Sequence, residues 1–287
     1  MASSSRDSRS NLPRWRLILP RRFDGPTNMA IDEALLTTVG EGHQPPTLRF
    51  YDWDSVWVSL GSSQTSTDLA ADALRDRGWR LSRRPSGGMA VVHLGQLGYA
   101  LILPADDPRW QGDLAVSYER LSRPFVPGFE RLGAAVHLAS SAEKADFSLN
   151  APALAARSCF GALGPYEIVA NGKKIVGNSQ VRRRHAHLQH GVIQLRGNQS
   201  TLVDLLACQD ECKRAALRDY LDRRVGSLEA LVGHTIGVEE VVHAVTNACS
   251  EAFEVSFAAG ELTPRERELA ETLVREKYGQ EIWTFRR

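Results

Sequence analysis

The sequence predicts an α/β protein whose C-terminal part is helical. Short alternating strands and amphipathic helices follow one another as far as residue 195, and helical spacing dominates beyond residue 200. The 287 residues, of which 43% are hydrophobic and 24% charged, can bury a sizeable core. No internal repeat or low-complexity linker divides them. We therefore expect a single domain over residues 13–287, with residues 200–287 as its helical part.

Alternation and helical spacing place the elements in order. Strands are expected over residues 15–19, 47–53, 55–60, 80–84, 89–93, 98–103 and 135–139. Helices are expected over residues 26–39, 68–77, 113–132, 201–207, 211–223, 238–253 and 263–278. Thr27 is a plausible N-cap of the first helix, and Gly78 ends the second. Residues 142–156 show little pattern and are expected to form a mobile loop.

Composition limits the partners and the cellular compartment that we expect for the protein. The formal net charge is +1, so bulk electrostatics favour no particular partner. Four cysteines occur without a C-x-x-C or a disulfide spacing, which predicts a reducing cytosol and a cytoplasmic protein. No apolar run is long enough to predict a membrane span. Residues 1–12 are serine-rich and charged, without the apolar core of a signal peptide, and are expected to form a flexible tail.

A tight Pro-Ser-Gly-Gly loop at residues 85–88 separates two of the predicted strands. Two glycines let a backbone approach a ligand closely and point its amides at it. Arg83 and Arg84 precede the loop and His93 follows it, so the loop could hold a carboxylate, a phosphate or an acyl carbonyl. The alternative is an ordinary glycine hairpin with solvated arginines, and the loop taken alone favours that alternative.

Residues 157–195 are the stretch around which the chain is organised. Cys159 lies among small and turn-forming residues, and Asn171-Gly172 is a strong hairpin signal. Strands are expected over residues 166–170, 173–176 and 188–195, with Gly177 stopping the second. The hairpin can bring a lysine back towards the thiol, and a nearby ammonium raises a thiolate fraction. This is the first indication of nucleophilic chemistry, although a buried free cysteine is usually a small hydrophobe.

The other cysteines are expected to be structural. Cys208 and Cys212 stand at i and i+4 of a predicted helix, where packing of one helical face is the better interpretation. Cys249 fits the buried face of the next predicted helix.

Three histidines raise the possibility of a zinc site. His185, His187 and His190 could join Cys159 as metal ligands. Strand alternation puts His190 on the opposite face from the other two, so we expect no metal. The arginines at residues 182–184 could contact phosphates, but without interleaved aromatic residues we expect no nucleic-acid binding.

Three motifs occur in order along the chain. Residues 83–93 read RRPSGGMAVVH, residues 172–180 read GKKIVGNSQ, and residues 188–191 read LQHG. Residues 28–32 add the helix pattern N-x-A-x-D. In this order and spacing they resemble the lipoate–protein ligase and octanoyltransferase superfamily, over roughly residues 14–287. The resemblance implies a biotin/lipoate ligase fold, a mixed β-sheet flanked by helices with a smaller sheet beside it.

The Ser-Cys-Phe around Cys159, a few residues before Tyr-Glu-Ile-Val, is similar to the cysteine-dependent LipM-type octanoyltransferases. This resemblance implies transfer of an octanoyl group from acyl carrier protein to a lysine of a lipoyl domain, such as glycine cleavage H protein. It implies a cysteine thioester intermediate, no cofactor and a monomer. Two alternatives stay open: an ATP-dependent lipoate–protein ligase, indifferent to Cys159, and a non-catalytic acyl-binding protein of the same fold.

The resemblance also assigns roles. Cys159 would be the nucleophile, and Lys174 would orient the acyl carbonyl and assist proton transfer. Lys174→Ala is expected to fold normally, and Lys173 to tolerate change. The implied substrate-binding residues, several of them lining an acyl tunnel, are Arg84, Ser86, Gly87, Gly88, His93, Gly177, Gln180 and His190. The family pattern is not followed at Met89, Gly98 and Asn178-Ser179, which leaves the acyl-chain preference open.

Overall fold

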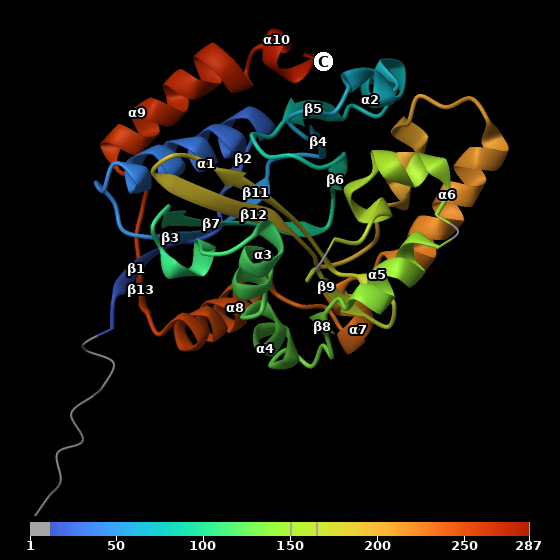
Figure 1. Ribbon diagram of the computed structural model, residues 1–287. Helices are drawn as coiled ribbons and strands as arrows, with labels where there is room; N and C mark the ends of the chain where they lie inside the picture. The colour runs from blue at the N-terminus through green and yellow to red at the C-terminus, as the bar shows by residue number, and fades with distance from the viewer. Residues whose placement is uncertain (1–11, 150, 165, 287) are drawn as a thin grey trace, which may run out of the picture.

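A mixed seven-stranded sheet runs through the molecule, which is described by a computed structural model over residues 12–149, 151–164 and 166–286 (Figure 1). Its strands follow the order β11-β12-β7-β3-β1-β13, with β2 attached to β3. They are β1 (Arg14–Ile18), β2 (Arg22–Phe23), β3 (Thr47–Trp53), β7 (Gln96–Pro104), β11 (Val176–Arg182), β12 (Ala186–Gln194) and β13 (Ser256–Ala259). Residues 1–11 of the predicted tail lie outside the described residues.

Two three-stranded sheets lie beside the main sheet, in the orders β5-β4-β6 and β10-β9-β8. Their strands are β4 (Trp57–Leu60), β5 (Arg80–Arg83), β6 (Val91–His93), β8 (His137–Leu138), β9 (Ile168–Ala170) and β10 (Lys173–Lys174). The predicted mixed sheet flanked by helices is confirmed, with two small sheets where one was expected.

Helices cover both faces of the main sheet, with α1 and α9 on one face and α4 and α8 on the other (Figure 1). The α-helices are α1 (Gly25–Gly40), α2 (Ala71–Asp76), α3 (Leu114–Ser122), α4 (Phe125–Glu130), α5 (Ser141–Ser148), α6 (Glu211–Arg224), α7 (Leu228–Val232), α8 (Val238–Phe253), α9 (Pro264–Leu273) and α10 (Glu281–Thr284). Short 3₁₀ turns are η2 (Ser66–Asp68), η3 (Pro108–Trp110), η4 (Ala153–Arg157), η5 (Cys159–Gly161) and η6 (Ser200–Leu205), and η7 (Val274–Tyr278) is a π-turn. Within the described part of the chain, no helix is long and apolar enough to cross a bilayer.

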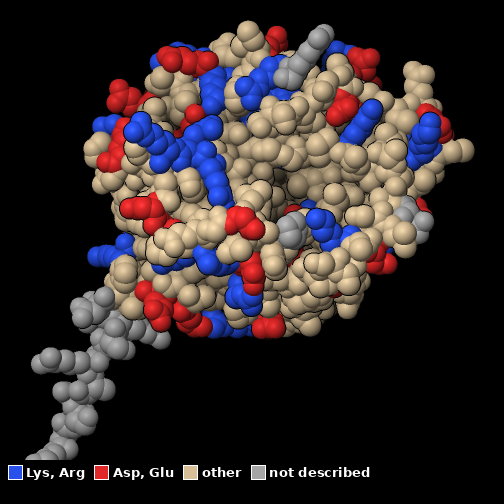
Figure 2. Space-filling view, viewed as in Figure 1, with Lys and Arg blue, Asp and Glu red and all other residues tan. Residues whose placement is uncertain are grey.

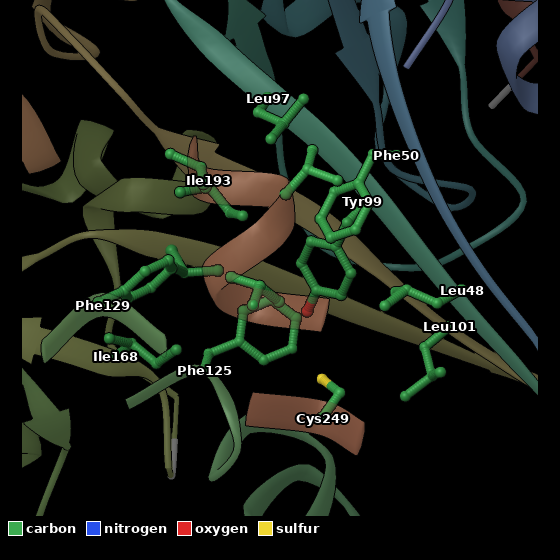
Figure 3. Close-up of a cluster of buried hydrophobic side chains, with 14 of the residues drawn as sticks. Leu48, Phe50, Leu97, Tyr99, Leu101, Phe125, Phe129, Ile168, Ile193 and Cys249 are labelled. Carbon is green, nitrogen blue, oxygen red and sulfur yellow. The ribbon is translucent and has the colours of Figure 1, made fainter. Parts of the chain in front are cut away.

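The side chains of strand β7 alternate between the hydrophobic cores on the two faces of the main sheet. Leu97, Tyr99 and Leu101 belong to the core beneath α4 and α8 (Figure 3). Ala100 and Ile102 belong to the core beneath α1. Because successive side chains of a strand point to opposite faces, the third residue of the α1 side is Gly98. The face covered by α1 therefore has a position in β7 without a side chain.

The core beneath α4 and α8 also contains the Cys249 thiol (Figure 3). That thiol is fully buried, and burial raises its pKa to about 12. The expectation that Cys249 packs in the core is confirmed. Cys208, in contrast, precedes α6 and packs against the core in part, whereas Cys212 is exposed, so the single packed helical face predicted for this pair is wrong.

Two predicted segments have different structures. The helix expected over residues 113–132 is divided into α3 and α4 around Pro124, because proline has no N–H with which to continue the helical hydrogen bonds. The mobile loop expected over residues 142–156 is wrong, since it contains α5 and η4. Helix α5 begins with a capping box between Ser140 and Glu143.

Three further differences concern a helix cap, a helix type and an additional strand. The first helix is capped by Asp24, whose carboxylate accepts from the Thr27 amide at 2.7 Å, so the N-cap expected at Thr27 is wrong. Residues 201–207, expected as a helix, form the 3₁₀ turn η6. Strand β13 was not expected within the helical part; it pairs in parallel with β1 and thereby joins distant parts of the chain.

A buried ion pair fixes α9 against the sheet. Arg16 of β1 donates to the Glu266 carboxylate at 2.6 and 2.9 Å, and Thr38 of α1 donates to it at 2.9 Å. Burial alone raises a carboxyl pKa, but the hydrogen bonds and charge of Arg16 outweigh it and hold the pKa of Glu266 below its usual value.

We expect Glu266→Gln to lower the free energy of unfolding by about 3 kcal/mol at pH 7, because Arg16 keeps a buried charge without a counter-ion. A depressed carboxyl pKa contributes stability that is lost as pH falls through the folded value. The difference from the wild type should therefore shrink below about pH 4. Urea unfolding of both proteins at pH 7 and at acid pH measures it; a difference that grows on acidification would contradict the assignment.

Candidate active site

A small cavity lies beside Cys159, on the face of the main sheet that α1 covers. Its volume is about 30 Å³, roughly the share of one water molecule in the liquid. Five of the predicted site residues line it: Arg84, His93, Cys159, Gly177 and His190. Figure 2 shows a hollow in largely uncharged surface where β6 and β11 face each other in Figure 1. The sequence motifs therefore converge on one cavity although they are far apart in the chain.

Cys159 opens the 3₁₀ turn η5, and its amide donates to the Ala90 carbonyl at 3.0 Å. The turn packs directly onto β11 at Gly177. A Cβ added to Gly177 would lie 3.1 Å from the Phe160 ring and 3.5 Å from the Cys159 sulfur. Gly177 is the second residue of β11, so the prediction that it stops a strand is wrong. Its missing side chain makes room for the Phe160 ring, and the Cys159 sulfur lies at ordinary contact distance from the same position.

Lys174 lies behind Cys159 rather than on the cavity wall. The predicted hairpin is confirmed, with Asn171 and Gly172 both in the left-handed region at φ 51° and 71°. The Lys174 ammonium donates to the Cys159 carbonyl at 2.7 Å and to the Ala162 carbonyl at 3.1 Å. It also contacts the Glu167 carboxylate at 2.8 Å. An ammonium has three protons, so all of them are engaged as the structure stands.

Glu167 is a residue to which the sequence assigned no role. It is 6% exposed, and besides Lys174 its Oε2 accepts from the Gly164 amide at 2.7 Å. The signal that could have found it is its place in the Tyr-Glu-Ile-Val segment just before the hairpin. The Glu167–Lys174 pair joins β9, β10 and the loop that carries Cys159.

A buried chain of polar groups holds the Ser-Gly-Gly loop. Ser86 Oγ lies 2.5 Å from His190 Nε2, and His190 Nδ1 lies 2.9 Å from the Asp32 carboxylate. Asp32 in turn accepts from Arg49 at 2.5 Å. All four are buried; of the two predicted site residues brought together here, His190 lines the cavity and Ser86 is not among the lining residues. Asp32 belongs to the N-x-A-x-D pattern, but the sequence alone did not predict which side chains hydrogen-bond to it.

Both arginines before the loop are buried, so the interpretation with solvated arginines is wrong. Arg84 donates to the carbonyls of Ser59, Gly87 and Met89 at 2.8–3.0 Å. Burial lowers the pKa of both guanidinium groups. Since their donors are used on backbone carbonyls, the two side chains hold the loop in shape.

Arg83 donates hydrogen bonds to more backbone carbonyls than Arg84 does. It donates at 2.6 Å to Gly61 and to Gln64, and it also donates to the carbonyls of Trp283, Thr284 and Arg286. The last three belong to the C-terminal segment, which therefore lies against the loop that follows β4.

His93 and Gln180 differ in their distance from the cavity. His93 stacks on Trp53 with ring centroids 3.8 Å apart, and its Nε2 lies 2.8 Å from Ser59 Oγ. Burial, and then the charge of Arg84, lowers the pKa of His93 well below its ordinary value, so the ring is neutral at pH 7. Gln180 does not line the cavity; it bonds to Gln189 at 2.9 Å on the opposite face of β11.

The histidines considered for zinc point in different directions. His190 contacts Ser86 and Asp32, whereas His187 packs edge-on against Trp110 with centroids 5.2 Å apart. Among the residues the structure describes, no group of three or more histidine, cysteine or acidic side chains is arranged to hold a metal ion.

The sequence model of the lipoyl protein ligase A/B catalytic domain matches residues 24–250, which include Asp32, Ser86, Cys159, Lys174 and His190. The chain belongs to this family. The resemblance stated from the motifs is thus confirmed.

Curated relatives within the lipoyl protein ligase family carry one name. A protein of Kyrpidia tusciae named octanoyltransferase LipM is 36% identical over 274 residues, covering 95% of this chain and 99% of the relative. One of Brevibacillus brevis with the same name is 33% identical, covering 96% of this chain and all of the relative. The expected similarity to LipM-type octanoyltransferases is therefore confirmed.

Solved structures of the lipoyl protein ligase family agree in fold. A bipartite lipoate protein ligase from Thermoplasma acidophilum matches with a TM-score of 0.79 at 25% identity, covering 95% of this chain and 96% of that one. A lipoate–protein ligase A bound with ATP matches with a TM-score of 0.76 at 25% identity, covering 95% and 98%.

The buried ion pair changes one expectation from the sequence. Because Lys174→Ala leaves the Glu167 charge buried without its partner, we now expect it to lower the free energy of unfolding by about 3–5 kcal/mol. Lys173→Ala should cost under about 0.5 kcal/mol, since that side chain reaches only the Asp222 carbonyl at the surface. Urea unfolding compares the two. Adding Glu167→Gln to Lys174→Ala should recover part of the loss, and equal losses at the two lysines would refute the assignment.

Proposed function

We propose that this protein is an octanoyltransferase that takes an octanoyl group from acyl carrier protein and passes it to a lysine of a lipoyl domain through a thioester on Cys159. The observation that carries the proposal is the position of Cys159. Its sulfur lies against Gly177 at the cavity, and its backbone carbonyl is held by Lys174 at 2.7 Å. The names of the curated relatives support the same reaction class.

In the first half-reaction the Cys159 thiolate attacks the thioester carbonyl of the octanoyl carrier. A new carbon–sulfur bond forms as the old one breaks, and the carrier leaves as a thiolate that takes up a proton. Because one thioester replaces another, this exchange is nearly balanced in free energy. The cysteine thus divides one transfer between two large proteins into two simpler steps.

In the second half-reaction the lysine amine of the lipoyl domain attacks the acyl-cysteine. An amide bond forms, the bond to Cys159 breaks, and the amine loses a proton. An amide is more stable than a thioester, so this step is favourable and requires neither a nucleotide nor another cofactor.

Both half-reactions pass through an oxyanion, for which the glycine loop supplies donors. Among the described residues, no group accepts a hydrogen bond from the amides of Gly87 and Gly88. Arg84 and Ser179 both donate to the Gly87 carbonyl, which fixes the orientation of the following peptide. Free amides on a fixed loop are suited to a developing negative charge.

Lys174 contributes in two ways. It holds the Cys159 carbonyl in place, and its positive charge lies behind a nucleophile that works as a thiolate. To reach an acyl carbonyl it must release one present partner, and the contact with Ala162 is the longest at 3.1 Å. Glu167 keeps the ammonium in position during that exchange.

We expect octanoyl carrier protein, without ATP, to place one octanoyl group on Cys159, and a lipoyl domain then to remove it as a lysine amide. Intact-mass measurement follows both steps. Cys159→Ala should abolish the adduct, and Cys159→Ser should slow its formation greatly, because a serine hydroxyl without a dedicated base is a weak nucleophile.

Cys212→Ala serves as the matched control, since that thiol is exposed and outside the cavity, and it should be acylated as the wild type is. If Cys159→Ala still modifies the lipoyl domain, and does so only with ATP and free lipoate, the protein is a ligase like the ATP-bound structure it matches. The proposal would then be wrong.

A further inference from the structure

Four residues form one row across four neighbouring strands, on the face of the main sheet that α1 covers. Gly177 in β11 pairs with Val192 in β12. Val192 pairs in turn with Gly98 in β7, and Gly98 pairs with Tyr51 in β3. Directly paired residues point to the same face of a sheet. The cavity beside Cys159 is lined by Gly177, Val192 and Tyr51, so it follows this row.

The row has the nucleophile at one end. The Cys159 sulfur lies 3.5 Å from the position of a Cβ on Gly177. Neighbouring strands are about 4.8 Å apart, so Gly98 lies roughly 10 Å from Gly177 along the row. An extended medium-chain acyl group is of about this length.

The other end is closed by the Tyr51 ring. A Cβ on Gly98 would lie 2.5 Å from a ring carbon of Tyr51, so the ring lies directly over that glycine. The Arg49 guanidinium lies over the same ring, 4.3 Å from its centroid, and is itself held by Asp32 at 2.5 Å. Tyr51 is 3% exposed, and burial raises the pKa of its hydroxyl well above the ordinary value. The end wall is therefore uncharged and firmly held.

The residue that covers the row, Met29, can change its conformation more easily than the ring at the end of the row. Met29 of α1 lines the cavity and is 2% exposed. A methionine side chain has several rotatable bonds and adapts its shape. The present volume of about 30 Å³ is too small for an acyl chain, and Met29 is the lining residue that can most easily make room.

We propose that Tyr51, seated on Gly98, sets the length of the acyl chain that the protein accepts. A chain attached to Cys159 runs along the row, displaces Met29 and ends against the Tyr51 ring. This inference rests on the proposed function, and it adds a specificity-determining residue to it.

The test uses hexanoyl, octanoyl, decanoyl and dodecanoyl carrier proteins, with the initial rate of adduct formation followed by intact mass. Tyr51→Leu lengthens the row, so the rate with decanoyl relative to octanoyl carrier should rise at least about tenfold, in line with the value of one well-fitted methylene in an apolar pocket. An unchanged ratio in a protein that is acylated would overturn the inference.

Gly98→Ala tests the contact between the Tyr51 ring and Gly98 by adding a methyl group beneath the ring. The added methyl collides with Tyr51 and pushes the ring into the row, so octanoyl should lose at least about tenfold relative to hexanoyl. Combining it with Tyr51→Leu removes the collision and should restore acylation by octanoyl carrier. Phe50→Leu is the matched control: it changes the neighbouring aromatic residue, which points to the opposite face, and should leave the chain-length order unchanged.

Binding measured without chemistry separates this inference from the proposed function. Calorimetry with free hexanoate to dodecanoate is run on Cys159→Ala, with and without Tyr51→Leu. If the wild type takes up no acyl group but Tyr51→Leu still lengthens the preferred fatty acid, the proposed function fails while the role of Tyr51 in setting the accepted chain length stands. If no fatty acid binds, or the preference does not move, the inference is wrong.

Discussion

The contacts of the buried Asp32 carboxylate are the interaction on which the face with the candidate active site depends. It is completely buried, and it accepts from Arg49 at 2.5 Å and from His190 at 2.9 Å. A charge removed from water is tolerated only with such partners, because desolvation otherwise costs several kcal/mol. Asp32 belongs to α1 and its two partners to β3 and β12, so one carboxylate holds three elements at one point. Through Ser86 the glycine loop is tied to the same point, and through Arg49 the ring of Tyr51 is as well.

A second buried pair, Glu167 with Lys174, does the same for Cys159, the proposed nucleophile. The row of the main sheet beside the cavity contains two residues without side chains, Gly177 and Gly98, besides Val192 and Tyr51. Charge is thus used to hold the walls, while the space between them is left to apolar contacts. This division suits a substrate whose reacting end is polar and whose remainder is a hydrocarbon.

Local signals predicted much of this arrangement, and long-range pairing accounts for what they missed. Helix α8 agrees with its predicted range, and the Asn171-Gly172 turn forms as expected, because both depend on residues close in sequence. The capping box of α5 is present in the sequence as Ser-x-x-Glu, although the low pattern around it favoured a loop. Strand β13 has only four residues and no clear alternation, so its pairing with β1 could not be predicted locally.

The candidate site was also predictable only in part. The order of the motifs predicts that Cys159, Ser86 and His190 share one site, whereas the buried partners of the ionic groups were not predictable. Asp32 and His190 are 158 residues apart, and no local pattern relates them.

Arg83 makes the C-terminal segment part of the support of the catalytic loop by an unusual means. Its guanidinium contacts only carbonyl oxygens there, at Trp283, Thr284 and Arg286. Every residue type offers the same carbonyl, so most of this recognition does not depend on side-chain identity. The Arg286 side chain is the exception, since it donates to the Ser62 carbonyl at 3.0 Å, whereas the contacts of Arg83 require only that the path of the backbone is kept. The loop after β4 is therefore supported by the backbone course of the C-terminal segment more than by the side chains that the segment carries.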